Sequence, residues 1–175
     1  MAIGFTIYPG SDAQLDMYEE IVEMRKEAAS RGIATVIWSY PRGEAITKDG
    51  ETAIDVAAYA AQIAALLGAH IIKTKLSSDH IEQGEAKKVY EAQGIDVSTQ
   101  AARVKHCVEA AFAGRRIMVF SGGASKGTEA IYDDARAIRD GGGNGSIIGR
   151  NTFQRSREDA MAMLDKLVDI YKGRA

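Results

Sequence analysis

The sequence predicts an α/β protein built around a parallel sheet, and three observations support this prediction. Short runs rich in β-branched residues alternate with longer helical segments along the chain. The strand-like runs are almost continuously apolar, as in strands that are buried on both faces. Most of the helical segments end at a glycine, which commonly follows the last turn of a helix. Strict alternation of strands and helices is typical of a parallel sheet covered by helices.

The first two βα units are predicted in the first third of the chain. Residues 2–8 (AIGFTIY) are expected to form a strand and residues 12–31 a helix, with Asp12 as its N-cap. The second unit has a strand at 34–40 (ATVIWSY) and an alanine-rich helix at 51–67. Both strands consist largely of β-branched and aromatic residues, which favour strands.

The third unit is less regular than the first two. A strand is predicted at 70–75 (HIIKTK), and the polar stretch at 77–94 after it has little apolar periodicity. That stretch predicts a long loop with some helix. A helix at 97–113 completes the unit. The last two units are predicted as a strand at 116–120, a helix at 125–140, a strand at 145–149 and a helix at 153–172.

Five units in 175 residues fit a single domain over residues 1–175. The pattern allows two architectures, an open doubly wound parallel sheet or a partial TIM (β/α)8 barrel. A whole barrel needs about 250 residues, so length alone favours the doubly wound sheet. The first strand begins almost at residue 1, which leads us to expect a chain cut from a larger fold.

Composition excludes several classes of protein. The formal net charge of -2 gives no electrostatic basis for binding nucleic acid or an anionic membrane. No apolar run approaches the roughly 18 residues of a membrane span, and the N-terminus has no basic region typical of a signal peptide. Cys107 is the single cysteine and cannot form an internal disulfide, which favours a reducing cytoplasm. We expect Cys107 to be a small core residue.

Polar side chains follow the predicted strands at the edge where active sites of both architectures lie. Lys73 and Lys75 share one face of the third strand with Ile71, because side chains alternate along a strand. Burial and neighbouring positive charge lower the pKa of an amine and make it nucleophilic. The other interpretation is a lysine at a strand end that reaches solvent.

Trp38 and Tyr40 share a face at the end of the second strand. A tyrosine hydroxyl near a lysine amine can relay protons, although both aromatics could equally be core residues.

Two glycine loops predict a phosphate site. Ser121, Gly122 and Gly123 follow the fourth strand, and Gly149 and Arg150 follow the fifth. Glycine lets backbone amides approach an anion, and in barrels the loops after the last two strands often bind phosphate together. The three histidines have no metal-ligand spacing with one another or with the cysteine, so no metal and no cofactor are expected.

With these residues in hand, the sequence resembles the class I (Schiff-base) fructose-bisphosphate aldolases of the archaeal and bacterial type, a family that includes related phosphosugar lyases and thiolases. The resemblance extends through the whole chain. It rests on five segments in order: Ile7-Tyr8-Pro9-Gly10-Ser11, Trp38-Ser39-Tyr40-Pro41-Arg42-Gly43, Gly68-Ala69-His70-Ile71-Ile72-Lys73-Thr74-Lys75, Ser121-Gly122-Gly123 and Gly149-Arg150-Asn151-Thr152-Phe153-Gln154-Arg155.

The resemblance implies a partial TIM barrel whose five units match strands four to eight, and it overrides the preference drawn from length. It implies that Lys73 forms the Schiff base, that Tyr40 transfers protons and that Trp38 lines the pocket. Lys75 would have a supporting electrostatic role. The phosphate cradle would consist of Ser121, Gly122, Gly123, Gly149 and Arg150.

The implied activity is the reversible cleavage of fructose 1,6-bisphosphate to dihydroxyacetone phosphate and glyceraldehyde 3-phosphate. The family also uses an aspartate from the first barrel strand, and this chain has no such strand. A related lyase or thiolase reaction on the same lysine, and an inactive fragment that binds phosphometabolites, therefore stay open as alternatives. The resemblance further implies a cytoplasmic homo-oligomer with a phosphorylated ketose as its substrate.

Overall fold

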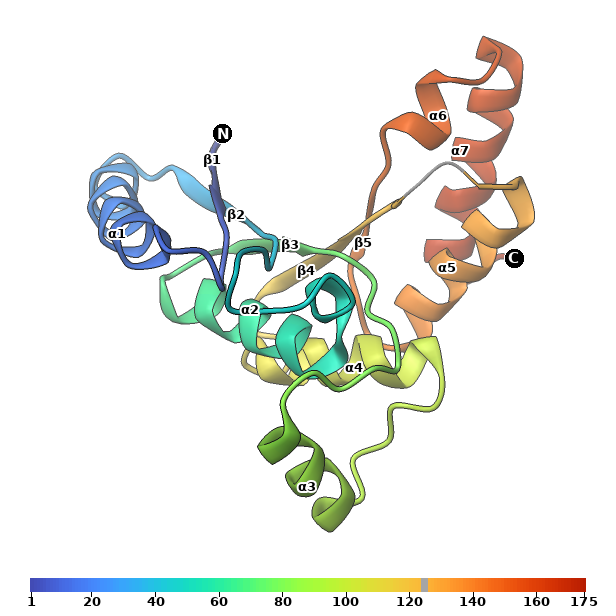
Figure 1. Ribbon diagram of the computed structural model, residues 1–175. Helices are drawn as coiled ribbons and strands as arrows, with labels where there is room; N and C mark the ends of the chain where they lie inside the picture. The colour runs from blue at the N-terminus through green and yellow to red at the C-terminus, as the bar shows by residue number, and fades with distance from the viewer. Residues whose placement is uncertain (124–125) are drawn as a thin grey trace.

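The computed structural model describes residues 1–123 and 126–175. Within them, strands and helices alternate as the sequence predicts (Figure 1). The elements are β1 (Ala2–Ile7), α1 (Gln14–Ser30), β2 (Ala34–Ser39), the 3-10 turn η1 (Gly50–Thr52), α2 (Ile54–Leu66), β3 (Ile71–Thr74), α3 (Gly84–Gln93), α4 (Gln100–Ala110), β4 (Ile117–Ser121), α5 (Thr128–Asp140), β5 (Gly145–Ile147), α6 (Arg150–Phe153) and α7 (Arg157–Tyr171).

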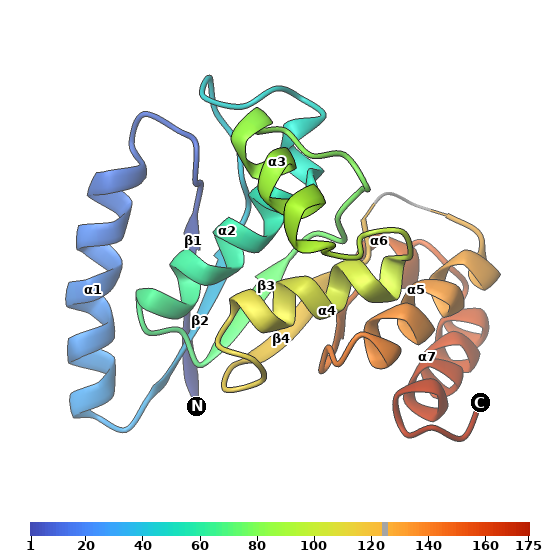
Figure 2. The ribbon, with the colours of Figure 1, turned by 90° about the horizontal axis from the view of Figure 1, so that it is seen from below.

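All five described strands are parallel and lie in the order β1-β2-β3-β4-β5. A doubly wound sheet reverses its strand order at a switch point, and this order contains no reversal. The doubly wound alternative is therefore wrong. Figure 2 shows α1, α2, α4, α5 and α7 following one another in an arc along the outside of the sheet. Consecutive strands with helices on one side are the arrangement of βα-barrel units.

One face of the sheet forms the core. Ile7, Ile37, Ile72, Met118 and Phe120 point toward the helices and are almost completely buried. Residues between them along the strands, such as Val36 and Lys73, are only partly buried. The expectation that both faces are buried is therefore wrong for this chain. Continuous apolar sequence is also compatible with a sheet whose second face is concave and open.

The helical layer has two apolar clusters. The larger lies between the sheet and α1, α2 and α4, where the small side chains of α2 allow close packing. The smaller joins α5 to α7 through five buried residues: Ile131, Ala135, Met163, Leu167 and Ile170. Among the described helices, none is long and apolar enough to cross a membrane.

Several element boundaries differ from the prediction. α1 begins at Gln14 after Ala13, which has no capping oxygen, so the prediction of Asp12 as N-cap is wrong. The polar stretch at 77–94 does contain a helix, α3. The predicted helix 125–140 begins at Thr128, and its first predicted residue lies outside the described residues.

The predicted last helix, 153–172, corresponds to α7 but begins too early, and only its first residue, Phe153, belongs to α6. α6 ends at Phe153, and α7 starts after Ser156, whose Oγ accepts a hydrogen bond from the backbone N–H of Asp159. A serine in this role is a common N-cap, and here it begins a new helix inside a continuous helical pattern.

Candidate active site

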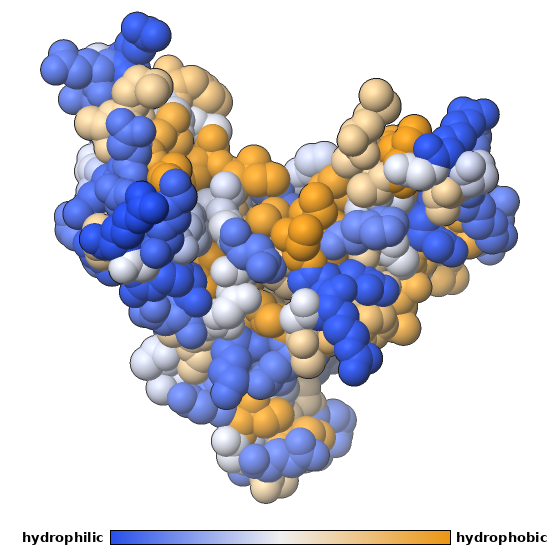
Figure 3. Space-filling model, turned by 180° about the vertical axis from the view of Figure 1, so that it is seen from behind, coloured by the Kyte–Doolittle hydropathy of each residue, from blue (hydrophilic) through white to orange (hydrophobic). Residues whose placement is uncertain are grey.

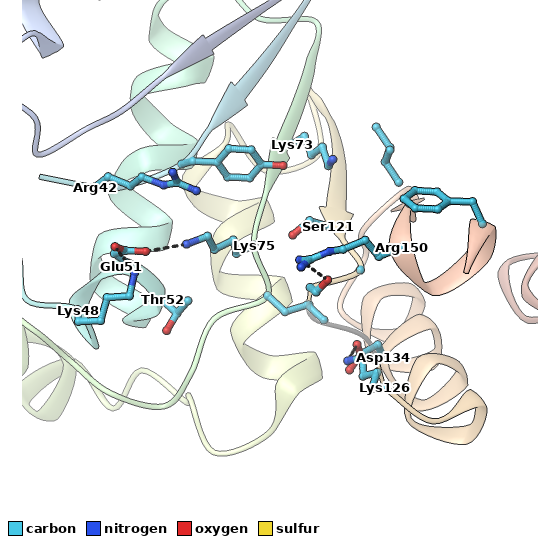
Figure 4. Close-up of a pocket in the computed structure, with 17 residues that line it drawn as sticks. Arg42, Lys48, Glu51, Thr52, Lys73, Lys75, Ser121, Lys126, Asp134 and Arg150 are labelled. Atoms are coloured by element: carbon cyan, nitrogen blue, oxygen red, sulfur yellow. Dashed lines mark hydrogen bonds and ion pairs between the residues drawn. The ribbon is translucent and has the colours of Figure 1, made fainter. Parts of the chain in front are cut away.

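A cavity of about 750 Å³ opens at the carboxyl edge of the sheet (Figure 4). Its walls come from the ends of β3 and β4, from the segments after β2 and β5, and from η1 and α5. The structure brings eight of the nine residues predicted for the site into its lining: Tyr40, Lys73, Lys75, Ser121, Gly122, Gly123, Gly149 and Arg150.

Lys73 lies on the concave face of β3, opposite Trp38 of β2 and Val119 of β4. Its Nζ is 5.9 Å from the centre of the Tyr40 ring. Burial lowers the pKa of Lys73, because the charged ammonium loses solvation. A larger share of this amine is therefore neutral near pH 7 than of a solvated lysine, as nucleophilic attack requires.

Lys75 has a different environment from Lys73. Its Nζ donates to Oε2 of Glu51 at 3.0 Å, and Oε1 of Glu51 accepts from Lys48 at 2.8 Å. These hydrogen bonds from the two lysines lower the pKa of Glu51. From the sequence we expect the positive charge of Lys75 to lower the pKa of Lys73. In the structure burial alone lowers that pKa, and Lys75 is paired with the carboxylate of Glu51.

Sequence reasoning missed Glu51. It is the first residue of the predicted alanine-rich helix, where an acidic side chain is ordinary, and η1 turns its side chain toward Lys75, 24 positions away along the chain. Nothing in the local pattern indicates such a contact.

Tyr40 follows the carboxyl end of β2, and its phenol is neutral. Its pKa is raised, mainly by burial and further by Tyr8, while the guanidinium of Arg42 acts in the opposite direction. A phenol of this kind stays protonated at neutral pH and can donate a proton. Arg42 also lines the cavity, so this end of the site has a further cation that the site prediction left out.

The prediction that Trp38 lines the pocket does not agree with the described cavity, whose lining residues omit it. Its ring instead lies over Gly4 of β1, where a Cβ on the glycine would come within 2.0 Å of the indole. The concave face is open at this edge, so the large side chain covers the neighbouring strand.

The two glycine loops lie next to each other and both line the cavity, since the backbone N–H of Gly122 donates to the carbonyl oxygen of Ile147 at 3.4 Å. Gly122 and Gly123 follow β4, and Gly123 has a φ of 67°, a value that glycine adopts without strain. Nη2 of Arg150 donates to the carbonyl oxygen of Gly123 at 3.2 Å. Lys126, which forms an ion pair with Asp134, also lines this side of the cavity. The site therefore offers backbone amides and cations to an anion.

Asn151 and Arg155 connect the loops, and sequence reasoning assigned neither a role. Asn151 is 2% exposed and bonds the backbone of Gly122 and Lys126. Arg155 bonds Thr128 and the carbonyl oxygens of Lys126 and Asn151. Both residues were part of the segment used for the resemblance, which was the one signal that pointed to them.

The described residues include no cluster of three side chains that could hold a metal ion. The three histidines are partnered: His70 accepts from Thr35, His80 contacts Glu82, and His106 contacts Tyr90. Cys107 is buried, and burial raises the pKa of its thiol to about 12. This confirms the expectation of a small core residue.

Comparison with known proteins agrees with this geometry. The sequence model of the DeoC/LacD family of aldolases matches residues 1–155. The class 1 fructose-bisphosphate aldolase of Thermoproteus tenax is 32% identical over 173 residues, which cover 98% of this chain and 56% of that protein.

Two solved structures show the same likeness. A crystal structure of an archaeal fructose 1,6-bisphosphate aldolase superposes with a TM-score of 0.78 at 31% identity, over 98% of this chain and 58% of that one. A second has its catalytic lysine covalently bound to the carbinolamine intermediate; it gives a TM-score of 0.77 at 29% identity, over 97% and 57% of the two chains. The chain thus spans little more than half the length of these relatives.

Proposed function

This chain belongs to the DeoC/LacD family of aldolases, and on that premise we propose that it carries the Schiff-base site of a class I fructose-bisphosphate aldolase. The reaction would be the reversible cleavage of fructose 1,6-bisphosphate to dihydroxyacetone phosphate and glyceraldehyde 3-phosphate. The observation that supports this most strongly is Lys73, an amine of lowered pKa that faces a cavity next to a protonated phenol and two glycine loops.

The chemistry begins with Lys73. Its neutral amine attacks the ketone carbon of the bound sugar, and loss of water from the carbinolamine gives an iminium ion. When the hydroxyl group on C4 loses its proton, the C3–C4 bond breaks and its electron pair moves into the iminium, leaving an enamine. The aldehyde departs, the enamine carbon is protonated, and water releases the ketone product. The positive iminium supplies the electron sink that this cleavage needs.

Tyr40 is the group we assign to proton transfer. Its hydroxyl stays protonated at neutral pH because burial raises its pKa, and its ring lies 5.9 Å from Nζ of Lys73. A phenol in this position can give a proton to the departing hydroxyl of the carbinolamine and receive one later. The carboxylates in the described lining, Glu51 and Asp134, are both engaged with lysines.

The glycine loops and Arg150 would bind the substrate phosphate. The backbone N–H of Gly122 donates to the carbonyl oxygen of Ile147 at 3.4 Å, so the donors that can surround the phosphate oxygens are the backbone amides of Gly123 and Gly149 and the Arg150 guanidinium. Holding one phosphate fixes the distance between the ketone and the amine, and such positioning lowers the barrier to attack. In this proposal Lys75 supports the site by its charge.

We also propose that the five βα units are strands four to eight of a TIM barrel. The unreversed strand order and the helices on one side of the sheet support this assignment. In such a barrel the cavity lies at the carboxyl end of the strands, where barrel enzymes bind their substrates.

Borohydride trapping tests the function. The protein is incubated with dihydroxyacetone phosphate and reduced, which converts an iminium to a stable secondary amine, and the modified peptide is located by mass spectrometry. We expect the adduct on Lys73 in the wild type and in Lys75→Ala, and none in Lys73→Ala. A folded wild-type protein without an adduct would contradict the proposal and leave phosphate binding without turnover as the explanation of the site.

A further inference from the structure

We propose that Asn151 is a positioning residue that, together with Arg155, fixes the two glycine loops as one phosphate-binding unit. This inference rests on the proposed function and deepens it. It concerns side chains that do not line the cavity in the described structure and would act through the backbone of those that do.

Asn151 uses both ends of its side-chain amide on the loop after β4. Nδ2 donates to the carbonyl oxygen of Gly122 at 3.0 Å, and Oδ1 accepts from the backbone N–H of Lys126 at 2.9 Å. The side chain thus holds the two described ends of that loop while its own backbone belongs to α6, directly after Gly149 and Arg150. At 2% exposure these hydrogen bonds are shielded from water, so their loss is not easily compensated by solvent.

Arg155 makes a second connection between the same two segments. Nη1 donates to Oγ1 of Thr128 at 2.8 Å, and Nη2 donates to the carbonyl oxygen of Lys126 at 3.3 Å. Nε donates to the carbonyl oxygen of Asn151 at 2.7 Å. The planar guanidinium therefore ties the start of α5 to α6 with three donors in fixed geometry, which a lysine cannot reproduce.

These contacts have a direct consequence for anion binding. The cradle consists largely of backbone amides, and their direction is set by the course of the loops. Gly122 also packs close to α6: a Cβ there would lie 3.2 Å from Ile148 and 3.5 Å from Nδ2 of Asn151. If the loops separate, the amides no longer converge on one phosphate, and a misplacement of about 1 Å can cost roughly 10²-fold in rate.

The chain offers a matched control in Asn144. Its Oδ1 also accepts from a backbone N–H, that of Met118 at 2.8 Å, but at the amino end of β4, away from the cavity. Asn144→Ala therefore removes the same kind of hydrogen bond without touching either glycine loop. Asn144 is exposed whereas Asn151 is buried, so a role of Asn151 in stability alone would lower the unfolding midpoint of Asn151→Ala more than that of Asn144→Ala, and the two folded variants would bind phosphate alike.

The experiment measures borohydride trapping at Lys73 as a function of substrate concentration for wild type, Asn151→Ala and Asn144→Ala. With dihydroxyacetone phosphate, we expect Asn151→Ala to raise the half-saturating concentration about tenfold or more, in keeping with the cost of misplaced binding groups. With dihydroxyacetone, which lacks the phosphate, trapping should be unchanged. Asn144→Ala should follow the wild type with both compounds.

Titration calorimetry with inorganic phosphate separates failure of this inference from failure of the proposed function. If the wild type forms no adduct, a weaker affinity of Asn151→Ala for phosphate still supports the positioning role. If Asn151→Ala binds phosphate and dihydroxyacetone phosphate as Asn144→Ala does, the inference is wrong, whether or not Lys73 reacts.

Arg155→Lys is a second variant, used also if Asn151→Ala does not fold. It keeps the positive charge and removes the planar guanidinium with its three donors. We expect it to weaken the same two phosphate readouts and to leave trapping of dihydroxyacetone unchanged, because the role assigned to Arg155 is geometric. An affinity equal to that of the wild type would show that Arg155 does not position the loops.

Discussion

The burial that makes Lys73 reactive also lowers the stability of the folded protein. Burial lowers the pKa of this lysine, so the folded protein binds its proton less tightly than the unfolded chain does, whose lysine titrates near 10.5. Between the lowered pKa and 10.5 the unfolded state holds more protons, and stability rises with pH across that window. Below the window the penalty of the buried charge is fully present.

Because the charged lysine destabilises the folded state at pH 7, we predict that Lys73→Met raises the midpoint of thermal unfolding at that pH. The methionine fills similar space and removes the desolvated ammonium. The gain should be a few degrees, since about 1 kcal/mol shifts the midpoint by roughly 2–4 °C at this chain length. It should shrink as the pH approaches 10.5, where the wild-type lysine is neutral in the folded state.

Lys75→Met is the control, measured by circular dichroism at the same pH values. That change removes the 3.0 Å ion pair with Glu51 and should give no comparable gain at pH 7. A lower unfolding midpoint for Lys73→Met than for the wild type at pH 7 would show that the lysine is not destabilising.

Single residues differ in how far the sequence predicts them. Lys73 and Tyr40 could be found because strand alternation and position at a strand end are local properties. Glu51 and Asn151 could not, because their partners lie 24 to 29 positions away along the chain and depend on how η1 and α6 turn. Trp38 was assigned to the pocket by resemblance, and its ring covers Gly4.

At the scale of elements, α3 is held to the rest of the protein by few contacts. None of its ten residues is buried. Oη of Tyr90 lies 2.7 Å from Nε2 of His106 on α4, with the two rings edge to face at 5.1 Å. Figure 1 shows α3 standing away from the arc of helices. Segments with little buried surface open locally at low free energy.

We therefore predict that Tyr90→Phe loosens α3 without unfolding the protein. The ring packing is kept and one hydrogen bond is lost, worth about 0.5–1.5 kcal/mol, or roughly a fivefold change in the population of the open state. Limited trypsin digestion at Lys87 and Lys88 should quicken by about that factor, while the global unfolding midpoint should change little. Equal cleavage rates in wild type and variant would contradict this role for the contact. Tyr59→Phe, at an exposed tyrosine of α2, is the control.

The order and type of most elements followed from periodicity, whereas boundaries depended on capping. Ser156 sets the start of α7 later than the predicted start at residue 153, because its side chain caps the helix while the helical sequence pattern continues across it. The polar stretch before α4 had too little apolar periodicity to locate α3, since that helix buries none of its residues.

The molecule as a whole has two arms, with α1 at one end and α6 and α7 at the other (Figure 1). Figure 3 shows apolar residues gathered along the hollow between the arms. The strand order that distinguishes this arrangement from a doubly wound sheet is a property of long-range pairing. Length and alternation could not determine it, and they favoured the wrong alternative until the resemblance was considered.

α7 has apolar side chains on two separate faces. Met163, Leu167 and Ile170 are buried against α5. Met161, Leu164 and Val168 lie at spacings of three and seven residues, which places them on one other face of the helix, and they are 50%, 37% and 47% exposed. β1 and β5 are the outer strands of the sheet, and each pairs with a described strand on one side only. Exposed apolar stripes and unpaired strand edges both favour association.

We predict that the 175-residue chain, prepared by itself, self-associates through this face of α7, so that its sedimentation coefficient rises with protein concentration. Val168→Glu should shift the distribution toward monomer, because a carboxylate buried in an apolar contact loses its solvation without a partner. Ala162→Glu adds the same charge at an exposed position about 100° around the helix from Met161 and outside the stripe, and it should sediment as the wild type does. If Val168→Glu and Ala162→Glu sediment alike, this face of α7 is not the contact. The open edges of β1 and β5 then become the surfaces to test, because backbone pairing there does not depend on the side chains of α7.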